Sequence, residues 1–167
     1  MDRKNLFPTL VAGFGAAVLT TVPGIKNFAC CLLLPMAVVV ALFLDHKLNK
    51  TQLPITLKSA ISFGFFTALF ATIFSTFFDV LITFITHTND FIQALPQTEM
   101  MVRQYHLETL LEQTMTLLKQ MASDIQVSGF SILYTFGIFI SNFIINTIFG
   151  LLGGILGMTF INKRTQI

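Results

Sequence analysis

The sequence predicts an all-α integral membrane protein with four transmembrane helices and an extracytoplasmic amphipathic helix. Apolar residues make up 54% of the 167 residues and charged residues only 11%, and the mean hydropathy is +0.77, all far from the averages of soluble domains. Most of the charged residues lie in polar segments between long apolar runs. The first three runs are close to the roughly 20 residues that a helix needs to cross a bilayer. Residues 1–167 are therefore expected to form a single membrane domain.

The first two apolar runs predict transmembrane helices over about 6–22 and 27–44. The first run stops at Pro23-Gly24, a pair that favours a turn. Because the connection is so short, the two helices are expected to form an antiparallel hairpin. Pro35 lies inside the second run and predicts a kink there.

The remaining two spans are separated by a more polar stretch. A third apolar run predicts a helix over about 58–80, and the charged residues then become frequent in an extracytoplasmic helical insertion of about 87–130. The final charge-free stretch, Ile125 to Asn162, is longer than a bilayer requires. We therefore place the fourth crossing at about 138–161 and the earlier part of the stretch outside the membrane.

Within the insertion, one apolar stripe has helical spacing and the charged residues lie away from it. Its members are Leu107, Leu111, Thr114, Leu118, Met121 and Ile125. Pro96 is expected to break the segment that precedes this helix. The pattern predicts an amphipathic helix that lies on the membrane surface or packs against a partner.

The distribution of basic residues predicts the orientation of the chain. Seven of the ten Lys and Arg residues fall on one side of the predicted topology: Arg3, Lys4, Lys47, Lys50, Lys58, Lys163 and Arg164. Lys26, Arg103 and Lys119 fall on the other side. The positive-inside rule therefore predicts a multi-pass protein with both termini in the cytoplasm.

Small residues form the most definite pattern in the predicted spans. They are Gly13, Ala16 and Ala17 in the first helix and Gly150, Gly153, Gly154 and Gly157 in the last. Such rows let helix backbones approach closely, which membrane helices need because lipid supplies no hydrophobic drive for association. Their partner is a helix either of this chain or of another chain.

Three polar residues in the apolar helices form a possible polar site: Asp79, Asn142 and Asn146. By helix length, Asp79 reaches the outer interface, which favours an interfacial carboxylate over a proton-coupling group. Asn142 and Asn146 share one helix face and are expected to hydrogen-bond to a neighbouring helix. The alternative is a polar ligand cavity that these two residues line together with Asn27.

No pattern of catalytic or metal-ligating residues stands out, so we predict no catalytic site, no metal and no cofactor. His46, His87 and His106 lie in different loops without partners at ligand spacing. Cys30 and Cys31 are adjacent in an apolar run and are interpreted as small buried residues.

The overall layout resembles a known group of membrane proteins. The features that carry the likeness are the small-residue first helix, the Pro23-Gly24 turn, the polar linker, the long outer insertion, and Gly153-Gly154-Ile155-Leu156-Gly157 shortly before the basic C-terminus. This layout is similar to that of four-helix bacterial inner-membrane proteins of Bacteroidetes-like lineages that contain a domain of unknown function. The resemblance covers the whole chain and implies a bacterial inner membrane, but no activity and no site.

These features favour a non-enzymatic protein that acts by association, as an accessory, scaffold or assembly subunit of a membrane complex. The expected partners are the lipid bilayer and other membrane protein subunits or a second copy. Nucleic acid is not expected, because the formal net charge is only +2 and the basic residues are scattered. The alternative is a small oligomeric transporter or channel with a polar path around Asp79, Asn142 or Asn146.

Overall fold

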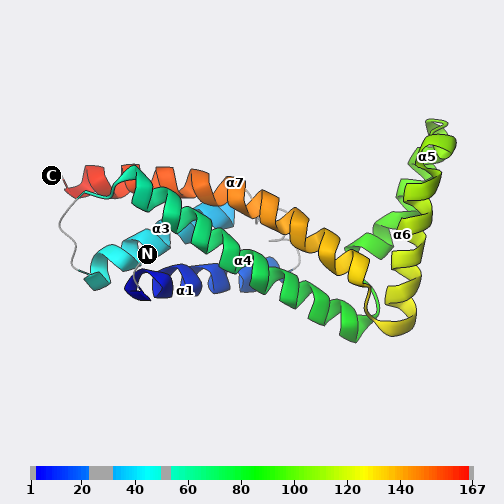
Figure 1. Ribbon diagram of the computed structural model, residues 1–167, viewed down its shortest axis with the longest axis horizontal. Helices are drawn as coiled ribbons and strands as arrows, with labels where there is room; N and C mark the ends of the chain where they lie inside the picture. The colour runs from blue at the N-terminus through cyan, green and yellow to red at the C-terminus, as the bar shows by residue number, and fades with distance from the viewer. Residues whose placement is uncertain (1–2, 23–31, 50–53, 166–167) are drawn as a thin grey trace. The chain divides into compact units, whose positions relative to one another are not determined.

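A computed structural model describes residues 3–22, 32–49 and 54–165, and all of its regular secondary structure is helical. Figure 1 shows the course of its six helices. In chain order they are α1 (Arg3–Thr20), α3 (Leu34–Asn49), α4 (Leu57–Thr86), α5 (Asp90–Gln104), α6 (Glu108–Ser128) and α7 (Ile132–Thr165). The predicted all-α class is therefore confirmed.

Two of the described helices are long and apolar enough to cross a membrane, namely α4 and the Ile132–Lys163 part of α7. The apolar part of α1, Leu6–Thr20, is shorter, and α3 has 16 residues. Residues 27–31 of the predicted second span lie outside the described part of the chain, as do Pro23-Gly24, Cys30 and Cys31. Four crossings remain a prediction.

The chain divides into two compact units that share α4 and α7. Residues 1–78 and 139–167 form the first unit, and residues 79–138 form the second. The second unit nearly coincides with the predicted insertion over 87–130, but it also takes in the last turns of α4 and the first turns of α7.

Small side chains make up much of the core of the first unit. Ala12, Ala41 and Leu42 are buried with Phe63, which is only 1% exposed. Ala16, Ala68 and Ala71 form a second buried cluster. Because alanine adds so little bulk, the helices that carry these clusters pack with their backbones close together. Pro35 is the second residue of α3, and the two residues before this helix, Leu32 and Leu33, have π-helical backbone.

Two hydrogen bonds of the Asn162 side chain join the segment before α4 to the end of α7. The Asn162 amide accepts from the backbone N–H of Ile55 at 2.8 Å and donates to the Ile55 carbonyl at 2.9 Å. Both backbone groups precede the first turn of α4, where the helix offers them no partner. Asn162 thereby fixes the position at which the chain enters α4.

The second unit contains a hairpin of α5 and α6, where a single amphipathic helix was predicted. The side chain of Asn89 caps α5 by accepting from Ile92 N at 2.9 Å. The helix then continues through Pro96, so the predicted break at this residue is wrong. The chain turns after Gln104 instead, where His106 has a positive φ of 54°.

Candidate functional sites

In the first unit, α7 packs against α4 through glycines on both helices. A Cβ atom built on Gly150 would lie 2.7 Å from the Gly64 carbonyl oxygen and 2.8 Å from Ala68 Cβ. A Cβ atom on Gly154 would overlap the carbonyl oxygen of Ala60. Because the obstructing atoms are mostly backbone, the two helices can approach this closely only where the Cβ is absent.

The other predicted small residues pack α7 against α3 and α1 against α4. A Cβ atom on Gly153 would lie 2.5 Å from Pro35 Cα, and one on Gly157 would lie 2.8 Å from Leu42 Cδ1. Gly13 faces α4, where its added Cβ would lie 2.9 Å from the Thr67 carbonyl oxygen. Ala16 and Ala17 are also buried, at 5% and 1% exposure. All seven predicted small residues thus lie in packed or buried positions within this chain.

A short polar seam lies between α4 and α7. It consists of Thr72 and Thr76 of α4 and of Asn142 and Asn146 of α7. Asn142 Nδ2 donates to Thr76 Oγ1 at 3.2 Å, and Asn146 Nδ2 donates to Thr72 Oγ1 at 3.1 Å. Thr72 Oγ1 also donates to the Asn142 carbonyl at 3.4 Å. The asparagines were expected from the sequence to bond with a neighbouring helix, but their partners were missed. The spacing of Thr72 and Thr76, which repeats the four-residue spacing of the asparagines, is the signal that identifies them.

Asp79 is assigned to the second unit, of which it is the first residue. Its side chain is partly buried and takes part in an interaction within the chain, so it is not an isolated carboxylate. The grouping of Asp79 with Asn142 and Asn146 as one polar site remains a prediction.

Replacing Asn146 by leucine is expected to reduce the free energy of unfolding by about 1 kcal/mol, the usual scale for a side-chain hydrogen bond between membrane helices. The loss arises because the Thr72 hydroxyl loses the donor that Asn146 supplies. The measurement is unfolding of the purified protein in mixed micelles by SDS, followed by circular dichroism. Ser141→Leu is the control, because Ser141 is exposed on the same helix. Equal stability of the two variants would show that the seam does not hold α7 to α4.

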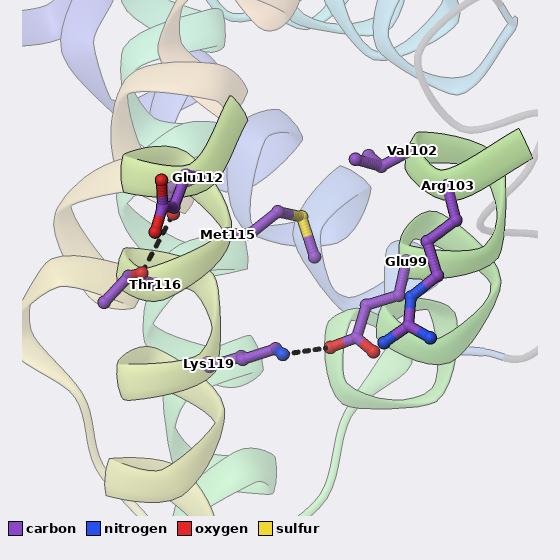
Figure 2. Close-up of a pocket in the computed structure, with 7 residues that line it drawn as sticks. All are labelled: Glu99, Val102, Arg103, Glu112, Met115, Thr116 and Lys119. Atoms are coloured by element: carbon purple, nitrogen blue, oxygen red, sulfur yellow. Dashed lines mark hydrogen bonds and ion pairs between the residues drawn. The ribbon is translucent and has the colours of Figure 1, made fainter. Parts of the chain in front are cut away.

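The α5–α6 hairpin of the second unit contains a pocket of about 200 Å³ (Figure 2). It is lined by Glu99, Val102 and Arg103 of α5 and by Glu112, Met115, Thr116 and Lys119 of α6. Val102 is nearly buried, and Figure 2 shows the Met115 side chain extending from α6 toward α5. The pocket therefore combines an apolar floor with a charged rim.

The pocket lining contains two acidic and two basic side chains, of which Glu99 and Lys119 form an ion pair. Lys119 Nζ lies 3.0 Å from Glu99 Oε1, and Arg103 lines the same pocket from α5. On the opposite wall, the Glu112 carboxylate has no ion-pair partner among the described side chains. Sequence periodicity placed Glu112 and Lys119 away from the apolar stripe but gave no sign that α5 would complete a pocket with them.

A second pocket, of about 180 Å³, lies in the first unit near the start of α4. Its lining includes Asp45, His46, Thr56 and Ser59. Asp45 and His46 are adjacent in the sequence. Throughout the residues that the structure describes, no group of three His, Cys, Asp or Glu side chains could hold a metal ion.

The described chain is thus a helical bundle with a glycine-packed unit and a hairpin that carries a pocket. Comparison with protein-family models, with curated proteins and with solved structures finds no match for this chain. The sites are accordingly interpreted from their own geometry.

Proposed function

We propose that this protein crosses a bacterial inner membrane four times, with both termini in the cytoplasm, and acts as a non-enzymatic accessory or assembly subunit of a membrane complex. The observation that carries the proposal is the glycine contact between α4 and α7, the two helices that are long and apolar enough to span. Membrane helices associate through such close backbone packing.

The extent of the first unit supports a membrane location for it. Within this unit α4 runs from Leu57 to Phe78, a length of about 33 Å at about 1.5 Å per residue. The hydrocarbon core of a bilayer is about 30 Å thick. The boundary between the two units therefore falls where a spanning α4 would leave the hydrocarbon, which supports an extramembrane position for the second unit.

The exposed surface of α7 in the first unit also suits lipid. Its exposed large residues are Ile140, Ile144, Ile145, Ile148, Leu152, Ile155, Leu156 and Phe160. Apolar side chains of this kind are at home against acyl chains, whereas an exposed apolar face of this length is unusual for a soluble monomer.

An associating protein is favoured over a transporter by how the polar groups are used. Asn142 and Asn146 bond to Thr76 and Thr72 of the same unit, so their amide donors are engaged in helix packing. A conducting path needs polar groups that exchange partners with the passing solute. The polar seam supports a structural role for these four residues.

The proposal is tested by extracting the protein from native membranes into lipid nanodiscs and identifying co-purifying proteins by quantitative mass spectrometry. An unrelated multi-pass protein extracted from the same membranes at the same level is the control. We expect a foreign membrane protein at fixed stoichiometry with this chain and not with the control. A pure homo-oligomer or a partner-free monomer would contradict the subunit role, and a homo-oligomer would direct attention to solute flux in liposomes.

A further inference from the structure

The turn of the α5–α6 hairpin exposes several apolar side chains. Leu110, Tyr105 and Met100 are 81%, 68% and 63% exposed, and Met101 and Leu107 next to them are also exposed. We call these five residues the apolar tip. The tip lies at the same end of the hairpin as Val102, Arg103 and Glu112 of the pocket, because all of them flank the α5–α6 connection.

The size of the pocket indicates what can occupy it. Sites for small molecules and cofactors usually enclose about 300–1,000 Å³. The pocket here has about 200 Å³, which is below this range. Met115 and Val102 supply apolar contacts, and methionine adapts its shape readily to an incoming group. An anchor side chain that enters a pocket of this kind is the usual centre of a protein–protein interface.

The charge of the hairpin indicates the partner's chemistry. Residues 87–130 contain five acidic and two basic residues, a formal net charge of −3, whereas the whole chain carries +2. An acidic surface repels an anionic bilayer and attracts a basic protein surface. Within the pocket, Glu99 already has Lys119 as a partner, so Glu112 is the carboxylate that is open to a cation from outside.

We propose that the pocket and the apolar tip form a docking surface for a partner protein whose large apolar side chain enters the pocket and whose neighbouring basic side chain pairs with Glu112. The inference rests on the proposed function, since it names the surface through which the accessory subunit holds its partner. Met100, Tyr105 and Leu110 widen the contact around the anchor.

The test uses the full chain in nanodiscs and three fluorescent helical peptides as probes, with empty nanodiscs as the blank. One peptide carries a central Phe flanked by Lys, the second the same Phe flanked by Glu, and the third a central Ala flanked by Lys. Fluorescence anisotropy is expected to show binding of the Phe–Lys peptide at least about tenfold tighter than that of either other peptide. Equal binding of the three peptides, or no binding of the Phe–Lys peptide, would overturn the proposal.

Variants of the pocket connect this binding to its residues. Thr116→Trp places a large side chain in the pocket from an exposed position, and Glu112→Lys reverses the charge of the rim. Each change is expected to weaken binding of the Phe–Lys peptide at least about tenfold. Gln113→Trp adds the same ring to an exposed residue outside the pocket lining and is expected to leave binding unchanged. Equal effects of Thr116→Trp and Gln113→Trp would overturn the assignment of the pocket.

A separate measurement asks whether lipid covers the tip. An environment-sensitive dye is attached at Leu110→Cys, with Cys30 and Cys31 replaced by Ala. In nanodiscs without peptide, emission typical of a water-exposed dye is expected, followed by a blue shift when the Phe–Lys peptide is added. A blue-shifted emission before any peptide is added would place the tip in the bilayer and overturn the proposal of a protein partner.

Failure of the docking surface and failure of the proposed function give different results in the nanodisc extraction. If Thr116→Trp retains a foreign subunit at the wild-type stoichiometry, the subunit role stands and the docking surface is wrong. If the wild type carries no foreign subunit, the subunit role itself is wrong. Loss of the subunit from Thr116→Trp with retention by Gln113→Trp supports both.

Discussion

Replacing Gly154 by alanine is expected to lower the free energy of unfolding by about 1–3 kcal/mol, the usual cost of inserting a methyl group into a filled helix contact. The added Cβ would overlap the carbonyl oxygen of Ala60, and this atom belongs to the backbone of α4. The contact can be relieved only if α4 and α7 move apart. Separation would also lengthen the bond of Asn146 to Thr72, which lies farther along the same helix pair.

The measurement is SDS-induced unfolding in mixed micelles, with Gly15→Ala as the matched control. Gly15 is a helical glycine of the same unit, and a Cβ atom built on it would meet nothing within 4 Å. The control is expected to keep its stability or to gain up to about 1 kcal/mol, because alanine is the better helix former. The close packing of α4 on α7 would be refuted if Gly154→Ala and Gly15→Ala behaved alike.

A second variant on the facing helix makes this test specific to the helix pair. A Cβ atom on Gly64 would overlap the carbonyl oxygen of Gly150, so Gly64→Ala is expected to destabilise the protein as Gly154→Ala does. Because both changes are relieved by the same separation of α4 from α7, their combined effect should be smaller than their sum. Full additivity would indicate that the two glycines report on independent contacts.

The small-residue rows show how far sequence reasoning reached in the first unit. Their spacing singled out Gly150, Gly153, Gly154 and Gly157, and the structure places all four in close contacts. The sequence did not indicate that Gly150 and Gly154 face α4 while Gly153 and Gly157 face α3. Helical spacing gives the angle of a residue around its own helix, whereas the identity of the neighbour depends on contacts between segments far apart in the chain.

The hairpin was harder to predict because the local signals competed with one another. Pro96 suggested a helix end. In the structure α5 begins after the Asn89 cap and continues past the proline. The actual turn contains His106 at φ 54°, a conformation for which no glycine in the turn gave warning. The pocket could not be predicted at all, since Glu99 and Lys119 meet only after α5 and α6 have folded together.

Under the proposed function, the first unit anchors the protein and the second unit binds the partner. In the first unit the glycines and the asparagine–threonine bonds are directed inward, and apolar side chains are exposed on the outside. In the second unit the pocket lies between α5 and α6, and the apolar tip is exposed.

Replacing Gly129 by alanine is expected to destabilise the second unit by about 2–4 kcal/mol, because two costs coincide at this residue. Gly129 ends α6 with φ 73°, a left-handed conformation that costs a residue with a Cβ about 1–2 kcal/mol. Its added Cβ would also lie 2.7 Å from the carbonyl oxygen of Phe84 and 3.3 Å from His87 Nε2. The turn between α6 and α7 must therefore move away from the end of α4.

Hydrogen exchange of the full chain in nanodiscs measures the effect locally, and faster exchange is expected in the last turn of α6 and the first turn of α7. Gly137→Ala is the control in the same unit, since a Cβ atom there would meet nothing within 4 Å. Gly129→Asn separates the two costs, because asparagine tolerates a positive φ but retains the collision with Phe84. If Gly129→Asn exchanges as slowly as the wild type, backbone conformation alone selects glycine; if it exchanges as fast as Gly129→Ala, the contact with Phe84 requires it.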